Sequence, residues 1–323
     1  AVIIPGGGSV GMEAVARQFA NDVHCLIIRN GWFSFRWTQI LDAGRIAAST
    51  TVKMARPDSE QHQAAFSPAP IEEVVAAIQA EKPAVVFAPH VETASGIVLS
   101  NDYIRAVADA VHAYGGLLVL DCVASGTLWV NMRELGVDVL ISAPQKGWSA
   151  TPCAALIMLS ERALLRLNES QSTSFALDLK KWHQIMLAYE NGGHAYHATM
   201  PTDALIYLRD AMRETEAAGF DARCQAQVTL GREVRSLLAE HCFRSVAAAG
   251  FEAPGVVVCY TDDDAIHTGK RFIELGLQCA AGVPLQCNEP AGFKTFRLGL
   301  FGLDKLQNIE RTVARLRTAL EAL

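Results

Sequence analysis

Short apolar runs alternate with amphipathic helical patterns along the first half of the chain. Nearly continuous apolar strands between such helices are typical of a parallel sheet that is covered on both faces. Right-handed crossovers then predict a doubly wound α/β layer. The predicted strands are 1–5, 24–30, 83–90, 117–121, 138–143 and 154–160, and the predicted helices include 12–20, 35–43, 71–80 and 101–115.

The pattern changes near Thr202, which we expect to be the N-cap of a long helix because a hydroxyl can accept a backbone hydrogen bond there. A chain of 323 residues exceeds the usual size of one compact domain. We therefore expect a large domain over residues 1–218 and a smaller C-terminal α+β domain over residues 219–323. From Thr202 onward the predicted helices are 202–219, 222–241, 266–276 and Leu303 to the end, and the predicted strands are 255–261 and 295–301.

The charge balance is mildly acidic, with 34 acidic and 28 basic residues and a net charge of -6. This argues against nucleic acid or an anionic membrane as the main partner. The eight cysteines form no C-x-x-C pair and mostly lie in apolar segments, which predicts reduced, buried thiols in a cytoplasmic protein. No short cluster offers three ligands at metal-binding spacing, so no metal is expected.

A carboxylate and an amine follow two neighbouring predicted strands. Asp121 ends LLVLD, and Lys146 lies just past the next strand, in DVLISAPQK. In an open parallel sheet both strand ends lie on the same edge, where ligands bind. The two side chains could form an ordinary ion pair, or they could be a lysine in imine linkage to a cofactor and a carboxylate facing its pyridinium nitrogen. Burial beside a cofactor would lower the pKa of the lysine and make it an effective general base.

The segment GGGSVG, residues 6–11, lies between a predicted strand and a predicted helix. Glycines let the backbone approach an anion closely, and the N–H groups at a helix start complement its charge. The string also fits the G-x-G-x-x-G pattern of dinucleotide-binding proteins, but Arg29 and Asn30 stand where that pattern needs an acidic residue. A phosphate cradle for a different cofactor fits as well, and a plain tight turn is a further alternative.

An aromatic residue and a histidine follow two other predicted strands. Phe33, in NGWF, can stack on a planar ring at the ligand edge, although an aromatic residue there can also belong to the core. His90 ends PAVVFAPH and could act as an acid or base. We expect a structural role for His90, because Lys146 already supplies the proton transfer.

Taken together, these residues resemble a known family. The chain keeps the order of motifs found in the class V aminotransferases of fold type I, and most closely in the alanine/serine–glyoxylate group. These motifs are GGGSVGMEA, NGWFSFRW, HVETASGI, LDCVASG, SAPQKGWSATP, YHATMPT and FRLGLFG. The resemblance covers essentially the whole chain, and LDxVxS…SxxQK is its most specific part. It implies pyridoxal 5'-phosphate as cofactor and a homodimer with active sites at the subunit interface.

The resemblance also implies a role for each matching residue. Lys146 would bind the cofactor covalently, and Asp121 would pair with its pyridinium nitrogen. Arg297, in FRLGLFG, would hold the substrate carboxylate through its planar fork. The other cofactor-binding residues would be Gly8, Ser9, Val10 and Gln145 at the phosphate, Phe33 and Val123 on the ring faces, Thr93 near the ring hydroxyl, and Tyr196 and Thr199 at the phosphate of the neighbouring subunit.

The chain departs from the family pattern in two ways. GGGSVG contains fewer Ser, Thr or His residues than is usual in the family, so phosphate binding would depend on backbone amides. Members normally have a further N-terminal segment with part of the substrate pocket and a dimer arm, and we expect that such a segment is missing from this sequence. Thr199 could instead be an ordinary loop residue before a helix, and Arg297 could be an exposed charge on an edge strand.

The activity implied by the resemblance is transamination from a small amino acid to a 2-oxo acid such as glyoxylate or pyruvate. A cysteine desulfurase or another lyase is the alternative within the fold; such relatives usually carry His before the cofactor lysine, where this chain has Gln145, and need a mobile reactive cysteine. A nicotinamide-dependent oxidoreductase that uses the turn at residues 6–11 is the alternative from another class. A non-catalytic relative that only binds partners is a third.

Overall fold

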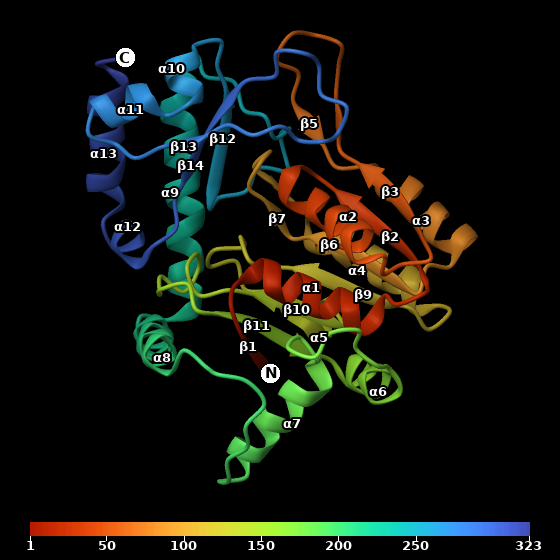
Figure 1. Cartoon of the computed structure of the whole chain (residues 1–323). Helices are drawn as coiled ribbons and strands as arrows, with labels where there is room; N and C mark the ends of the chain where they lie inside the picture. The colour runs from red at the N-terminus through yellow and green to blue at the C-terminus, as the bar shows by residue number, and fades with distance from the viewer.

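A seven-stranded sheet forms the centre of the computed structural model, which describes residues 1–323 (Figure 1). Its strands are β1 (Val2–Pro5), β2 (His24–Arg29), β3 (Ser49–Met54), β6 (Val85–Pro89), β9 (Leu117–Asp121), β10 (Val139–Ser142) and β11 (Ala154–Leu159). They lie in the order β1-β11-β10-β9-β6-β2-β3. Only β11 runs against the rest, because it pairs antiparallel with both β1 and β10 while all other pairs are parallel. The predicted mainly parallel α/β layer is confirmed.

Helices cover both faces of this sheet. One face packs against α1 (Gly8–Phe19), α2 (Trp32–Gly44), α6 (Glu161–Glu169) and α7 (Leu179–Glu190). The other packs against α3 (Ile71–Glu81), α4 (Asn101–His112) and α5 (Met132–Leu135). Successive residues of β9 alternate between the two cores, with Val119 in the first and Leu118 and Leu120 in the second. A strand buried on both faces has no polar side, which explains the continuous apolar runs in the sequence.

The carboxyl ends of the parallel strands meet at one edge of the sheet. Asp121 is in register with Pro89 of β6 on one side and with Ile141 of β10 on the other. The loop that carries Lys146 follows β10, and a small hairpin of β7 (Val91–Glu92) and β8 (Ile97–Val98) follows β6. The register therefore gathers Asp121, Lys146 and the β7–β8 hairpin at the edge where open parallel sheets bind ligands.

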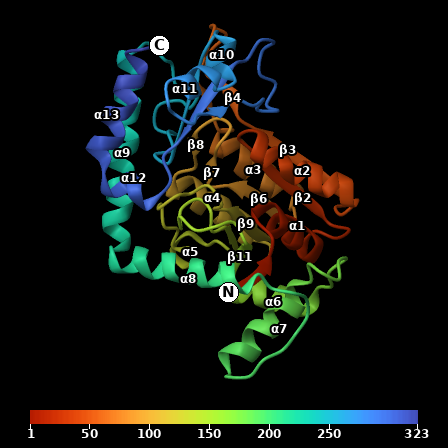
Figure 2. The ribbon, with the colours of Figure 1, turned by 60° about the vertical axis from the view of Figure 1, so that its left-hand side comes forward.

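The C-terminal part packs helices against a second sheet, in which β14 lies between β12 and β13. Helices α9 and α13 lie side by side along it in both views (Figures 1 and 2). The core here includes Leu230, Phe272, Phe296 and Leu316. Helix α8 (Thr202–Ala217) leads into this part, and its elements are α9 (Phe220–Glu240), β12 (Val256–Tyr260), α10 (Asp264–His267), α11 (Lys270–Glu274), β13 (Ala280–Ala281), β14 (Thr295–Gly299), α12 (Leu303–Gln307) and α13 (Ile309–Leu320).

Three predicted details of this part are wrong. Pro201, not Thr202, is the N-cap of α8, and Thr202 is already its first helical residue. The predicted helix at 266–276 is split into α10 and α11, because Gly269 adopts φ +78° between them. The predicted final helix is interrupted at Asn308, whose φ of -133° and ψ of 57° are not helical.

A further core joins the two parts of the chain. Phe66, from the short hairpin of β4 (Arg56–Pro57) and β5 (Phe66–Ser67), packs with Val258 and Phe293, and its N–H donates to Val246 O at 2.7 Å.

We propose that the domain boundary lies between residues 218 and 219. Gly219 turns the chain with φ +81° between α8 and α9, and the C-terminal core contains only later residues.

None of the helices combines the length and the apolar character that a membrane span requires. All eight cysteines are free thiols. Most of them are buried, but Cys224 is half-buried and Cys242, in the turn after α9, is exposed. The prediction of core thiols is therefore wrong for Cys242, which ends a helix at φ +63° where the chain turns outward.

Candidate active site

Asp121 is a buried carboxylate without a cationic partner. Its side chain lies at the end of β9, the residue is 9% exposed, and Oδ1 accepts a hydrogen bond from Val123 N at 2.9 Å. Asp121 takes part in none of the ion pairs of the chain. Burial raises the pKa of Asp121 to about 6, against the lowering effects of the Val123 N–H, Arg36 and Lys146. Such a group is suited to receive a positive charge from a ligand.

Lys146 lies in the loop between β10 and β11, and its side chain is half-buried. Its Nζ is 5.3 Å from the centroid of the Phe301 ring, and it forms no ion pair. Burial lowers the pKa of Lys146, Arg297 lowers it further, and Asp121 opposes both. A lysine with a lowered pKa is a better nucleophile and base near neutral pH. Phe301 was not predicted as a site residue, because it follows β14 and comes close to Lys146 only through the packing of the C-terminal part.

Backbone contacts fix the loop that carries Lys146. A Cβ atom on Gly147 would overlap with the carbonyl oxygen of Gly126, so the two backbones touch here. Ser149 Oγ accepts a hydrogen bond from Leu303 N, the first residue of α12, at 3.0 Å. The lysine is therefore held between the loop after β9 and the C-terminal part of the chain.

The turn at residues 6–11 brings the start of α1 to the same place. Gly6 adopts φ +133°, and its N–H donates to Cys153 O at 2.9 Å. A Cβ atom on Gly8 would lie 2.6 Å from Val123 Cγ2, so only glycine allows this approach. The first turn of α1 contains no acidic residue, and its N–H groups form the positive end of the helix. The geometry fits the predicted phosphate cradle, in which Ser9 and Val10 follow Gly8.

Phe33 lies in the first turn of α2, and its ring contacts two guanidinium groups. The Cζ atoms of Arg36 and Arg297 are 5.2 and 5.6 Å from the ring centroid. Arg297 is on β14, the central strand of its sheet, which excludes the edge-strand alternative. Its Nε donates to Ala281 O at 2.8 Å, and its two terminal nitrogens make no hydrogen bond in the chain. They are available to a carboxylate.

Glu92 is a fully buried carboxylate that the sequence analysis did not single out. It accepts hydrogen bonds from Phe33 N, Ser34 N, Ser34 Oγ and Ala94 N at 3.2, 2.8, 2.7 and 3.0 Å. It thereby binds the N-terminus of α2, where backbone N–H groups have no helical partner. This contact sets the position of Phe33 from the neighbouring hairpin. HVETASGI places an acid after a predicted strand, which was the available signal.

His90 is 4% exposed, and its Nδ1 lies 2.7 Å from Ser125 Oγ. Its backbone N–H donates to Asp121 O at 2.9 Å. Burial lowers the pKa of His90 to about 4, so the ring is neutral at neutral pH. These contacts support the expected structural role.

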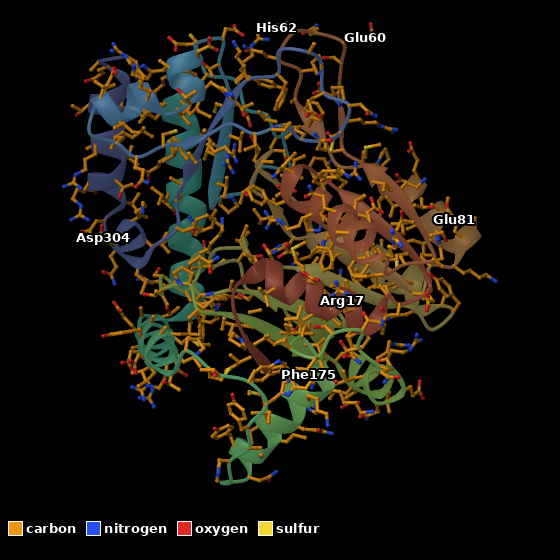
Figure 3. All side chains as sticks on the ribbon, in the orientation of Figure 1. Arg17, Glu60, His62, Glu81, Phe175 and Asp304 are labelled. Carbon is orange, nitrogen blue, oxygen red and sulfur yellow. The ribbon has the colours of Figure 1, made fainter.

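The remaining predicted residues are divided between two places. Thr93 follows Glu92 and is 5% exposed, and Gln145 precedes Lys146 with its side chain exposed. Tyr196 and Thr199 lie elsewhere, in the loop between α7 and α8, with their hydroxyl oxygens 3.4 Å apart. Tyr196 is 78% exposed, so most of its side chain is open to solvent. In the same region His197 packs on Phe175, which Figure 3 labels.

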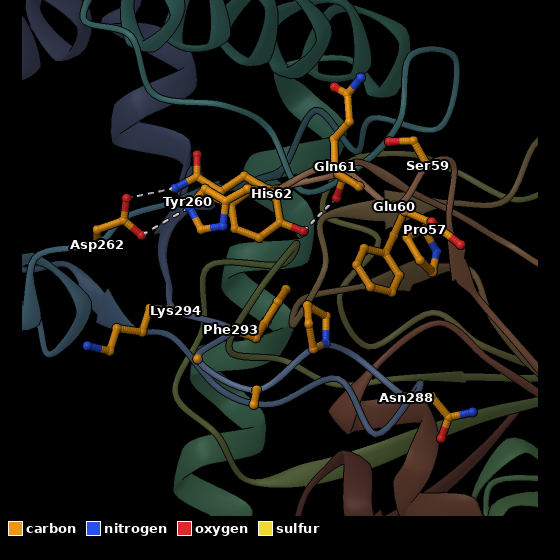
Figure 4. Close-up of a pocket in the computed structure, with 16 residues that line it drawn as sticks. Pro57, Ser59, Glu60, Gln61, His62, Tyr260, Asp262, Asn288, Phe293 and Lys294 are labelled. Carbon is orange, nitrogen blue, oxygen red and sulfur yellow. Dashed lines mark hydrogen bonds and ion pairs between the residues drawn. The ribbon is translucent and has the colours of Figure 1, made fainter.

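A separate cavity lies between the β4–β5 hairpin and the C-terminal part (Figure 4). Three aromatic rings pack together in its wall, with Phe293 between Phe66 and Tyr260. Tyr260 donates its hydroxyl hydrogen to Ala64 O at 2.6 Å. No residue predicted for the active site lines this cavity, so it is distinct from the group around Lys146.

Residues 7–265, well over half of the chain, match the family Aminotransferase class-V. Fold and site thus define a pyridoxal-phosphate-dependent enzyme of fold type I. More specifically, the chain belongs to the class-V aminotransferase family.

Similar proteins agree with this family. A 2-aminoethylphosphonate–pyruvate transaminase of Burkholderia ambifaria (strain MC40-6) is 29% identical over 331 aligned residues, which cover 100% of this chain and 82% of the relative. An alanine–glyoxylate aminotransferase of Oryctolagus cuniculus is 25% identical, with 78% of this chain and 64% of the relative covered. The crystal structure of an alanine–glyoxylate aminotransferase from Nostoc sp. has a TM-score of 0.79 at 23% identity and covers 98% of this chain and 81% of that one. That structure bears on the fold alone.

Pyridoxal phosphate fits the residues that are present. The unpaired buried carboxylate of Asp121 suits a protonated ring nitrogen, and the unpaired amine of Lys146 suits a carbonyl group. The close approach of Gly8 to Val123 brings the N–H groups of α1, which suit a phosphate, to the strand end that carries Asp121. Acid, amine and anion site lie at one edge of the sheet, as the cofactor requires.

Proposed function

We propose that this aminotransferase moves an amino group from a small amino acid to a 2-oxo acid such as pyruvate or glyoxylate. Similar proteins support this choice, since the Burkholderia relative is a pyruvate transaminase and the Oryctolagus cuniculus relative is a glyoxylate aminotransferase. The observation that carries the proposal is that Lys146 and the buried Asp121 both lack an ion-pair partner and follow the neighbouring strands β10 and β9 at one edge of the sheet.

Lys146 and Asp121 divide the chemistry between them. The bound cofactor supplies an electron-withdrawing ring that makes the α-hydrogen of the substrate acidic. The Asp121 carboxylate would hold the ring nitrogen in its protonated form. Lys146 Nζ accepts the proton from the α-carbon of the substrate, and burial and the nearby Arg297 favour the neutral amine needed for this step.

Binding of the other groups falls to the residues around this pair. Arg297 would bind the substrate carboxylate with its two free terminal nitrogens, and Phe33 and Val123 would pack on the faces of the cofactor ring. Thr93 would lie near the ring hydroxyl of the cofactor. The phosphate is held by Gly8, Ser9 and Val10 and by Gln145, in the binding mode that helix N-termini offer to anions.

The working unit in this proposal is a homodimer. Tyr196 is 78% exposed and Phe175 80% exposed, in a region where α7 projects from the rest of the molecule in both views (Figures 1 and 2). Exposed aromatic rings grouped in this way are typical of protein interfaces. In the dimer, Tyr196 and Thr199 reach the phosphate of the partner subunit. Light scattering of the purified chain tests this, and a monomer at micromolar concentration would contradict it.

A cytoplasmic location is part of the proposal. It is supported by eight cysteines without a disulfide, because reducing compartments keep thiols free. Cell fractionation with an antibody to the chain tests the location.

The activity test measures alanine formed from pyruvate, and glycine formed from glyoxylate, with a panel of amino donors that includes alanine, serine, aspartate and 2-aminoethylphosphonate. We expect turnover with particular donors and none in Lys146→Ala. Lys270→Ala is the matched control, because Lys270 is exposed at the start of α11. Turnover retained in Lys146→Ala would contradict the proposal, and sulfide release from cysteine would favour a desulfurase.

A further inference from the structure

Arg36 joins the two helix starts that border the site. It lies in α2, and its Nη1 donates a hydrogen bond to Ser9 Oγ at 2.7 Å, across to the first turn of α1. A serine hydroxyl that accepts from a guanidinium keeps its own hydrogen free to donate. Ser9 can therefore bind Arg36 and an anion at the same time.

The guanidinium of Arg36 has no acidic partner. It forms none of the ion pairs of the chain, although arginines elsewhere on the surface pair with Glu13, Glu73 and Asp304. Its Cζ lies 5.2 Å from the centroid of the Phe33 ring, which limits where the side chain can go. An unpaired arginine that is held in place by a ring and a hydroxyl is prepared to bind an anion.

The charge of Arg36 acts on the proposed active site. Burial is the main cause of both pKa shifts, since it raises the pKa of Asp121 and lowers that of Lys146. The charge of Arg36 has a smaller effect and lowers both pKa values. The residues at positions 6–11 include no basic side chain. The start of α1 thus offers an anion backbone N–H groups and one hydroxyl, and the nearest cation bonded to it is Arg36.

We propose that Arg36 is a ligand of the cofactor phosphate and supplies the positive charge that the glycine turn lacks. This inference rests on the proposed function, because it takes the phosphate to lie at the start of α1. A phosphate dianion gains more from a guanidinium fork than from backbone amides alone, since charge-assisted hydrogen bonds are shorter and stronger. Arg36 would then act in binding rather than in proton transfer.

The test compares pyridoxal phosphate with pyridoxal, which lacks the phosphate, in titrations of the cofactor-free chain followed by absorbance. We expect Arg36→Gln to weaken binding of pyridoxal phosphate by about ten-fold or more and to leave pyridoxal binding within about two-fold. Arg36→Lys should give an intermediate loss, because it keeps the charge without the fork. Arg45→Gln removes the same charge from the exposed other end of α2 and should change neither constant.

A second measurement is independent of Lys146. Inorganic phosphate should raise the thermal unfolding temperature of the cofactor-free wild type and of Arg45→Gln, and should have little effect on Arg36→Gln. If Arg36→Gln does not fold, Arg36→Lys carries both comparisons.

Several outcomes would overturn the inference. Equal weakening of both compounds would make Arg36 a structural residue, and unchanged binding of pyridoxal phosphate with a raised KM for the 2-oxo acid would make it a substrate ligand. Failure of the proposed function looks different. In that case wild type and Lys146→Ala would bind pyridoxal phosphate equally well and without a visible absorbance band.

Discussion

The Cα of Gly8 lies so close to Val123 that a Cβ atom there would be 2.6 Å from Val123 Cγ2. This contact holds the start of α1 against the strand end that carries Asp121. Gly8→Ala forces one of the two segments to move, because such contacts cannot be accommodated in a packed site. We expect a loss of about 1–3 kcal/mol in the free energy of unfolding and weaker cofactor binding. Urea unfolding and cofactor titration measure the two effects. Gly7→Ala is the control, since a Cβ on Gly7 meets nothing within 4 Å.

Asp121→Asn should stabilise the cofactor-free protein at neutral pH. Because burial raises the pKa of Asp121 from 3.8 to about 6, the ionised form is disfavoured in the folded state. The associated stability is present below about pH 4 and is lost as the pH rises through about 6. Asparagine removes that loss, so the variant should be more stable than wild type above pH 6 by about 2–3 kcal/mol, and the difference should shrink at pH 5. A difference independent of pH would contradict this. Transamination should fall at every pH.

Glu92→Gln should destabilise the fold and the site together. Glu92 accepts four hydrogen bonds, two on each carboxylate oxygen; three come from the start of α2 and one from Ala94 N in its own hairpin. Glutamine keeps one acceptor oxygen and turns an N–H₂ group toward N–H donors, which leaves buried polar groups unpaired. We expect a loss of about 2–4 kcal/mol in urea unfolding. Glu72→Gln, exposed in the first turn of α3, should change stability by less than about 0.5 kcal/mol.

Arg297→Lys should affect substrate binding more than turnover. Lysine keeps the charge but cannot donate to Ala281 O through Nε while it offers two further nitrogens to a carboxylate. We expect KM for the 2-oxo acid to rise by about ten-fold or more, with a smaller change in kcat. Arg271→Lys, exposed on α11, is the matched control. A fall in kcat at constant KM would show that Arg297 does not bind the ground-state carboxylate.

The sequence predicted the layer and the residues at strand ends, because buried strands and the helices between them have distinct periods. Asp121 and Lys146 could be placed together since parallel strands end at one edge. The reversed direction of β11 could not be predicted, because an apolar run that is buried on both faces reads the same either way. The breaks at Gly269 and Asn308 were missed for another reason, since the helical pattern continues through both.

The missed residues of the site act across long stretches of chain. Glu92 binds Ser34 over a separation of 58 residues, and Phe301 comes to Lys146 from the C-terminal part. Such contacts depend on the packing of whole elements rather than on local pattern. Arg36 stood in a motif that was recognised, NGWFSFRW, but its contact with Ser9 exists only once α1 and α2 lie together.

The contact between Gly147 and the carbonyl oxygen of Gly126 involves backbone atoms alone. Gly126 also adopts φ +65°, so both positions exclude other residues for reasons unrelated to the chemistry. Ser149, two residues further on, adopts φ +57° and accepts a hydrogen bond from Leu303 N, so the loop around Lys146 is restricted on both sides. A lineage, or a combinatorial library, can therefore vary side chains outside this loop in search of new substrates while the lysine keeps its place. Diversity at 126 and 147 would instead displace the loop that positions the Lys146 amine.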